Sequence, residues 1–203
     1  MTDPVNLTDP IAALLAVVRA LRQGGIDSAV YGGLALAAYG EPRETKDADL
    51  AVVGVGGPEG MRALKAAGME VALAFDRVRF GGNLVTRITL LEDERHTGLN
   101  VADLVEPRST RFAKLALARA TTAELRGEPV RLLSPEDFVL FKLLSTRERD
   151  LEDAAAVVRS IGTRLDFSAV EAEAARLAQE IPDHQVAGRL VKLKELALGG
   201  PPG

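Results

Sequence analysis

The fold is decided by residues 30–53, which read VYGGLALAAYGEPRETKDADLAVV. The apolar run that ends at Tyr31 predicts a buried strand, and the pair Gly32-Gly33 interrupts it. The Ala- and Leu-rich residues 34–39 predict a helix, and residues 47–53 return to a strand pattern after a polar connection. A strand, a glycine pair, a helix and a second strand in this order indicate a mixed α/β unit.

The glycine pair and the two aspartates of this stretch are the first candidate site residues. A glycine pair between a strand and a helix lets the backbone approach a phosphate, which the first amides of the helix can then bind. Asp47 and Asp49 are two residues apart in a predicted strand, so their side chains point to one face. Two adjacent carboxylates repel each other unless a cation lies between them, and oxygen-only ligands suit Mg²⁺ or Mn²⁺. The pattern predicts a metal site; the alternative is a pair of aspartates that flank a strand in solvent.

A third acid completes the predicted site. Asp103 lies in the apolar strand pattern of residues 101–105, where a carboxylate is costly to bury without a partner. A two-metal site needs ligands for both ions, so Asp47, Asp49 and Asp103 are the predicted metal ligands. This prediction requires three acids from separate parts of the chain to converge in space.

The rest of the chain divides into two predicted domains, residues 1–133 and 134–203. The second is helical from the capping residue Ser134 onward. We expect an α+β fold in which helices flank a mixed sheet and a C-terminal helical bundle packs against it, with a cleft between the two domains as the place for a ligand.

The individual elements follow from periodicity and from turn residues. The predicted helices cover residues 10–23, 34–39, 58–67, 111–119, 135–144, 147–160, 167–180 and 183–198, and the predicted strands cover 26–31, 47–53, 69–75, 84–91, 99–105, 121–125 and 129–133.

The composition excludes several classes of protein. The 203 residues include no cysteine, so disulfides, thiolate metal sites and a cysteine nucleophile are excluded, and a reducing compartment is favoured. The N-terminus has no signal-peptide pattern, and no apolar run reaches the roughly 20 residues of a membrane span, so we expect a cytoplasmic protein with no membrane part. The net charge of −4 disfavours RNA modestly and does not decide between partners.

Residues 31–35 and 43–50 together resemble the signature of the polymerase-β-like nucleotidyltransferase superfamily. That signature is a Gly-Gly or Gly-Ser pair followed at a short distance by Asp-x-Asp or Asp-x-Glu; here 13 residues separate Gly33 from Asp47. Residues 134–137, Lys142 and residues 147–153 are similar to the helical part of the AbiEii-type branch, which includes toxins of bacterial toxin–antitoxin systems. The resemblance covers residues 26 to 160.

The resemblance implies a nucleotidyltransferase-like fold and transfer of an NMP from a nucleoside triphosphate to a hydroxyl acceptor, with release of pyrophosphate and a need for Mg²⁺ or Mn²⁺. The residues that it implies are Gly32 and Gly33 for the phosphates; Asp47, Asp49 and Asp103 for the metal ions, with Asp103 also as candidate general base; Lys142 for the triphosphate; and Asp150 as a helical acid near the nucleotide. Arg43 and Thr45 are further nucleotide-binding candidates from the connecting loop, although a loop arginine is more often solvated.

Several alternatives stay open at this point. The acceptor is a tRNA 3′ end, a protein tyrosine or a small molecule such as an aminoglycoside, and a toxin or antitoxin partner is expected in the first two cases. A binding module that has lost its activity is the rival function. Lys142, Arg149 and Asp153 share a face only if residues 135–153 form one helix, and Ser145-x-x-Glu148 predicts a break there. The alternative reading is that the charged residues Arg147, Arg149, Asp150 and Asp153 form surface i,i+3 and i,i+4 pairs.

Overall fold

The computed structural model describes residues 9–42, 45, 47–91 and 100–199. Arg43, a predicted nucleotide-binding residue, lies outside this part of the chain. In chain order the elements are α1 (Pro10–Gln23), β1 (Ser28–Val30), α2 (Gly32–Ala38), β2 (Ala48–Val52), α3 (Gly57–Ala66), β3 (Val71–Phe80), β4 (Asn83–Leu90), β5 (Asn100–Pro107), α4 (Thr110–Arg119), β6 (Thr121–Leu125), β7 (Glu128–Leu132), α5 (Pro135–Leu143), α6 (Glu148–Ile161), a 3-10 turn η1 (Gly162–Arg164), α7 (Phe167–Glu180) and α8 (Val186–Leu198).

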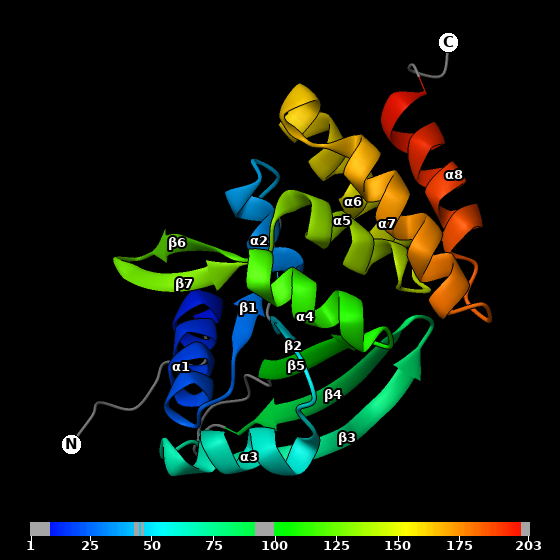
Figure 1. Ribbon diagram of the computed structural model, residues 1–203. Helices are drawn as coiled ribbons and strands as arrows, with labels where there is room; N and C mark the ends of the chain where they lie inside the picture. The colour runs from blue at the N-terminus through cyan, green and yellow to red at the C-terminus, as the bar shows by residue number, and fades with distance from the viewer. Residues whose placement is uncertain (1–8, 43–44, 46, 92–99, 200–203) are drawn as a thin grey trace.

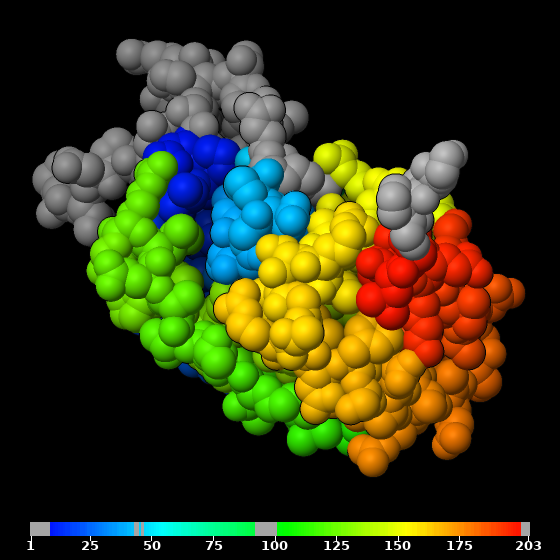
Figure 2. Space-filling model, turned by 90° about the horizontal axis from the view of Figure 1, so that it is seen from above, coloured from blue at the N-terminus to red at the C-terminus, as the bar shows by residue number. Residues whose placement is uncertain are grey.

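The strands form one mixed seven-stranded sheet in the order β3-β4-β5-β2-β1-β7-β6. The pairs β1·β7 and β2·β5 are parallel, and the remaining neighbours are antiparallel. Helices flank the sheet, and α5–α8 form a C-terminal bundle (Figure 1). Figure 2 shows these C-terminal helices, in yellow to red, packed together along one side of the molecule. The predicted α+β fold is confirmed.

The ends of several helices follow from local chemistry. Asp9 accepts hydrogen bonds from the amides of Ile11 and Ala12, and Pro10 occupies the first turn, so α1 begins where the sequence predicts. Ser134 caps α5 in the same way. The predicted break after α5 is also confirmed, because α6 starts anew at Glu148.

The longest departure from the predicted elements is β3, which was expected to end at Phe75 and continues to Phe80. The register of β3 on β4 shifts between Phe75 and Val78, so a bulge interrupts the alternation of residues. Arg77 takes a positive φ of 48° in this bulge. A strand with a bulge does not show a period of two along its whole length, and the second half of β3 therefore escapes a search for alternation.

Different helices cover the two faces of the sheet. Asp103 and Leu104 are consecutive in β5, so their side chains point to opposite faces. Leu104 lies against Gly60 of α3, whereas Asp49, the register partner of Asp103, lies against Gly32 of α2. The predicted acids are thus on the face opposite α3, and α5–α8 gather on the side of the sheet away from α3 (Figure 1).

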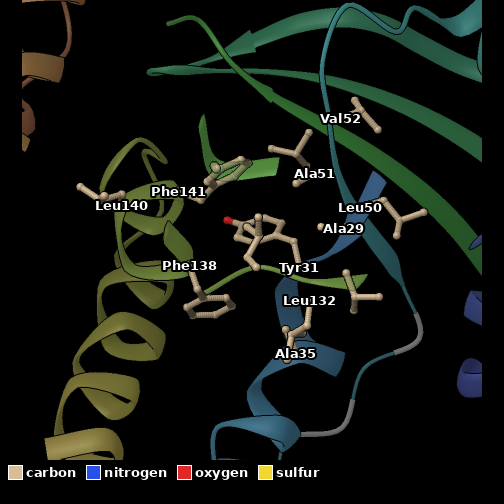
Figure 3. Close-up of a cluster of buried hydrophobic side chains, with 14 of the residues drawn as sticks. Ala29, Tyr31, Ala35, Leu50, Ala51, Val52, Leu132, Phe138, Leu140 and Phe141 are labelled. Carbon is tan, nitrogen blue, oxygen red and sulfur yellow. The ribbon is translucent and has the colours of Figure 1, made fainter. Parts of the chain in front are cut away.

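An aromatic cluster joins the sheet to the helical bundle. Tyr31, which follows β1, lies beside Phe138 and Phe141 of α5, with ring centroids 5.6 and 5.2 Å away (Figure 3). The Tyr39 hydroxyl donates a buried hydrogen bond to the backbone carbonyl of Leu133. One core cluster contains residues from both sides of the predicted boundary at 133/134. That boundary stays a prediction.

In the part of the chain that the structure describes, no helix is both long enough and apolar enough to cross a membrane.

The aromatic cluster should carry much of the stability. Phe138→Ala removes a fully buried ring that contacts both Tyr31 and Tyr39, so we expect the free energy of unfolding to fall by about 3–5 kcal/mol. Leu198→Ala, at a position that is 64% exposed, should change it by less than about 0.5 kcal/mol. Urea titration followed by circular dichroism measures both. Equal losses in the two variants would contradict this placement of the core.

Candidate active site

Two of the predicted acids lie side by side on neighbouring strands. In the parallel pair β2·β5, Asp49 is in register with Asp103, so both side chains are on the same face of the sheet. Burial raises the pKa of Asp49 to about 7, and the charges of Asp103 and then Asp47 act in the same direction. The charges of Lys142 and Arg147 oppose this shift. The sequence therefore locates a concentration of negative charge correctly.

Gly32 is required where the backbone meets Asp49. A Cβ at Gly32 would lie 1.9 Å from Oδ2 of Asp49, and the residue has a φ of +71°. Both facts exclude a side chain at this position. Gly32 and Gly33 are the first two residues of α2, whereas a break before the helix was expected. Their predicted role in phosphate binding stays a prediction.

The connecting loop touches the glycine pair through Thr45. A Cβ at Gly33 would lie 2.8 Å from the Cβ of Thr45, so the two backbones approach closely. The hydroxyl of Thr45 accepts a hydrogen bond of 3.3 Å from the amide of Asp47. Thr45 thus supports the chain immediately before β2, and its predicted contact with a nucleotide stays a prediction.

Asp103 has a partner that the sequence reading missed. Both of its carboxylate oxygens accept hydrogen bonds from Arg87 of β4, with distances of 2.8 Å from Nε and 2.6 Å from Nη2. The two residues are direct register partners in the antiparallel pair β4·β5. The available signal was a lone arginine within the strand pattern of residues 84–91, and finding its partner required the strand order.

The predicted metal group of three carboxylates is not formed as these side chains stand. Among the residues that the structure describes, no group of three or more His, Asp or Glu side chains is arranged to hold a metal ion. Arg87 binds both oxygens of Asp103, so a metal ion at this acid would lie close to a guanidinium of the same charge sign. Asp47 and Asp49 are oxygen ligands of the kind that a divalent ion takes, and a cation would offset the burial and the neighbouring negative charges that raise the pKa of Asp49. The ligand roles of all three acids stay predictions.

Lys142 is a buried ion-pair residue in the structure. It is 1% exposed, and its Nζ lies 2.6 Å from Oδ1 of Asp150 and 3.0 Å from Oδ2 of Asp153. The same ammonium lies 5.1 Å from the ring centre of Tyr31. The predicted contact with a triphosphate would require a phosphate to reach a lysine that two carboxylates already bind. The surface-pair alternative is wrong for Asp150 and Asp153, because both are buried.

Arg147 extends this buried group to the surface. Its side chain is 72% exposed, and its guanidinium donates hydrogen bonds of 2.8 and 3.2 Å to the two oxygens of Asp150. Its charge also lowers the pKa of Asp49, so it lies within electrostatic reach of the acids on β2. The sequence reading placed Arg147 among surface pairs. The i,i+3 pair with Asp150 is confirmed, but that acid is buried, and the exposed Arg147 also lies within electrostatic reach of the candidate site.

A separate cavity of about 510 Å³ lies beyond the other end of β2. Its lining includes Ile26, Val53, Glu59 and Leu117. It is thus distinct from the carboxylates at the start of the strand.

Sequence comparison identifies a family. A sequence model of the family described as Aminoglycoside-2''-adenylyltransferase matches residues 13–157 of this chain. The matched segment contains every predicted site residue, from Gly32 to Asp150. A search of curated proteins gives no match.

Three solved structures are similar to this chain at low identity. The first is described as a solution structure of the antibiotic-resistance factor ANT(2'')-Ia, with 17% identity, coverage of 83% of this chain and 93% of that one, and a TM-score of 0.47. The second is an antigenic nucleotidyltransferase-like protein from Paracoccidioides brasiliensis, with 22% identity, coverage of 90% and 93%, and a TM-score of 0.45. The third is ANT(2")-Ia in complex with adenylyl-2"-tobramycin, with 18% identity, coverage of 84% and 97%, and a TM-score of 0.46.

The buried ion pairs of Lys142 should be essential to folding. Lys142→Met removes the buried cation that Asp150 and Asp153 share, so we expect the free energy of unfolding to fall by about 3–5 kcal/mol. The matched control is Lys192→Met, which breaks the solvent-exposed pair with Glu148 and should cost less than about 1 kcal/mol. Urea unfolding at pH 7 compares the two. A Lys142→Met variant as stable as the control would show that the pairs do not form.

Asp150 should give the protein an acid-sensitive stability. Burial alone raises the pKa of Asp150, but the charge of Lys142 and hydrogen bonds from Arg147, Lys142 and Ser145 outweigh burial and lower it from 3.8 to about 2. A carboxylate with a lowered pKa stabilises the fold fully above its unfolded pKa, and this contribution is lost as the pH falls from about 4 to 2. We expect wild type to lose about 2 kcal/mol more than Asp150→Asn over that range. Parallel unfolding curves for the two proteins from pH 5 to pH 2 would contradict the assignment.

Proposed function

The chain belongs to the Aminoglycoside-2''-adenylyltransferase family, which makes it a nucleotidyltransferase, and from this membership we propose that it moves AMP from ATP to a hydroxyl group of an aminoglycoside. The observation that carries the proposal is the register pairing of Asp49 with Asp103 beside Gly32, inside the matched segment. This pairing places two carboxylates on one face of the sheet, next to the glycine pair that the superfamily signature requires.

Asp47 and Asp49 are the proposed ligands of a divalent ion, Mg²⁺ or Mn²⁺, and Asp103 is the proposed third ligand. When bound, such an ion offsets phosphate charge and lowers the pKa of an acceptor hydroxyl. Nucleotidyltransferases generally use divalent ions of this kind. Burial, followed by the charge of Asp103, raises the pKa of Asp49 to about 7, and this cost of holding a charged carboxylate supports a cation at this place.

The chain's own residues supply the remaining functions. Gly32 lets the α2 backbone come close to Asp49, which leaves the first amides of the helix near the acids. Arg147 is exposed and within electrostatic reach of Asp49, so it is placed to offset charge on nucleotide phosphates. Asp103 is proposed as the acid that accepts the proton of the attacking hydroxyl. Lys142 holds Asp150 and Asp153 and lowers the pKa of Asp49 from within the protein.

An aminoglycoside acceptor is proposed in place of a tRNA 3′ end or a protein tyrosine. The family match supports the nucleotidyltransferase superfamily but gives no support to the AbiEii-type branch, to a toxin–antitoxin partner, or to a tRNA or protein acceptor. An aminoglycoside is a polycation, and the chain's net charge of −4 favours such a substrate over RNA. The inactive-module alternative is set aside, since the family is one of enzymes.

Transfer of radiolabel from α-labelled ATP tests the proposal. Wild type with Mg²⁺ and tobramycin or a related aminoglycoside should form a labelled adenylylated product. Asp49→Asn should reduce the rate by on the order of 100-fold or more, because an amide is a far poorer ligand for a divalent ion. Glu106→Gln is the matched control, since Glu106 is a buried acid of the same strand as Asp103 whose side chain points to the opposite face.

The outcomes separate the candidates. Label on the aminoglycoside that depends on Asp49 but not on Glu106 supports the proposal. Label on tRNA or on a protein, with none on any aminoglycoside, would overturn the acceptor assignment and keep the reaction type. A fully active Asp49→Asn enzyme would overturn the site.

A further inference from the structure

Four side chains form a lateral row across the sheet. Asp49 of β2 is in register with Asp103 of β5, Asp103 with Arg87 of β4, and Arg87 with Phe75 of β3. Register partners on adjacent strands point to the same face, so the row runs from the candidate site toward the edge of the sheet. Arg87 is the cation of this row.

Arg87 interacts with more than its hydrogen-bond partner. The hydrogen bonds to Asp103 raise the pKa of Arg87, burial opposes this, and the charges of Asp103, Asp47 and Asp49 raise it further. One guanidinium therefore responds to all three acids that the sequence identifies as metal ligands. A divalent ion among the same acids would be subject to the same attraction.

The Arg87–Asp103 pair engages both oxygens through which Asp103 would bind a metal ion, and it holds a positive charge beside them. The fork is bidentate, so each oxygen of Asp103 already accepts a hydrogen bond. Arg87 itself is 36% exposed, and its guanidinium carbon lies 5.6 Å from the centre of the Phe75 ring. It can leave Asp103 toward solvent without moving a strand, because eight register pairs hold β4 to β5.

We propose that Arg87 is the resident counter-ion of this site and competes with the divalent metal for Asp103. The proposal rests on the proposed function, because it concerns the same metal site. In the metal-free protein, the positive charge of Arg87 neutralises the carboxylate of Asp103. If Asp103 held a divalent ion, the Arg87 guanidinium would give up its hydrogen bonds to that carboxylate and turn toward solvent, to which its side chain is already partly exposed.

The chain offers a matched comparison for this pair. Arg77 of β3 binds Glu106 of β5, so a second arginine pairs with a carboxylate of the strand that carries Asp103. Glu106 also accepts a hydrogen bond of 2.8 Å from the amide of Gly54, on the face opposite the candidate site. If an arginine–carboxylate pair mattered only for stability, the two pairs would behave alike toward metal.

Mn²⁺ binding without nucleotide tests the proposal. Free Mn²⁺ is measured by electron paramagnetic resonance, so the readout does not depend on catalysis. Arg87→Met should bind Mn²⁺ about fivefold more tightly than wild type, because one competing charge is lost from a partly exposed site. Arg87→Gln, which keeps polarity without charge, should show the same gain and serves if the Met variant does not fold. Arg77→Met should bind like wild type.

The double variant Arg87→Met/Asp103→Asn tests whether the change in Mn²⁺ affinity depends on Asp103. The gain in affinity should disappear in this variant, because Asp103 is the ligand for which Arg87 competes. Unchanged or weaker Mn²⁺ binding in both Arg87 variants would overturn the proposal. So would an equal gain in Arg77→Met, or a gain that persists without Asp103.

Failure of this inference is separable from failure of the proposed function. Suppose that the wild-type enzyme adenylylates an aminoglycoside and that the Arg87 variants bind Mn²⁺ no more tightly. The proposed function would then stand, and the proposed competition between Arg87 and the metal would be wrong. No Mn²⁺ binding by wild type or by either Arg87 variant would overturn both the metal site and the competition.

Discussion

The parallel pairing of β2 with β5 is the constraint on which the rest of the site depends. It fixes Asp49 beside Asp103 on one face of the sheet, where two carboxylates repel each other and need cations around them. Those cations come from separate elements: Arg87 from β4, Lys142 from α5 and Arg147 at the start of α6. The charge balance of the site therefore joins the sheet to the helical bundle, and the aromatic cluster around Tyr31 packs the same two parts together.

The cations differ in how firmly they are held, and this separates structural from functional charge. Lys142 is buried among two aspartates and two aromatic rings, so its place is fixed by packing and desolvation. Arg87 and Arg147 are partly or largely exposed and can move without exposing the core. A bound ion or nucleotide adds charges of its own, and the exposed arginines can change position to balance these charges. The fold thus holds the ammonium of Lys142 in one position near Asp49, whereas the guanidinium groups of Arg87 and Arg147 are free to move.

Much of the fold was predictable because its signals are local. The caps at Asp9 and Ser134, the glycine pair and the turn at residues 126–127 set element boundaries within a few residues. The partners of the charges were not predictable in this way. Arg87 reaches Asp103 only because β4 and β5 are neighbours, and that order is a property of the whole sheet. The burial of Asp150 and Asp153 likewise depends on the packing of α6 against α5, which brings both acids to Lys142 and which spacing along one helix does not reveal.

Asp49 and the charged side chains beside it are the proposed site of a divalent cation. Anomalous diffraction from crystals soaked with Mn²⁺ and a non-hydrolysable ATP analogue tests it most directly. We expect an anomalous peak for Mn²⁺ within bonding distance of a carboxylate oxygen of Asp49, with Arg87 turned away from Asp103. A Mn²⁺–nucleotide complex bound elsewhere on the protein, with Asp49 bonded to no metal and the Arg87–Asp103 fork intact, would contradict it.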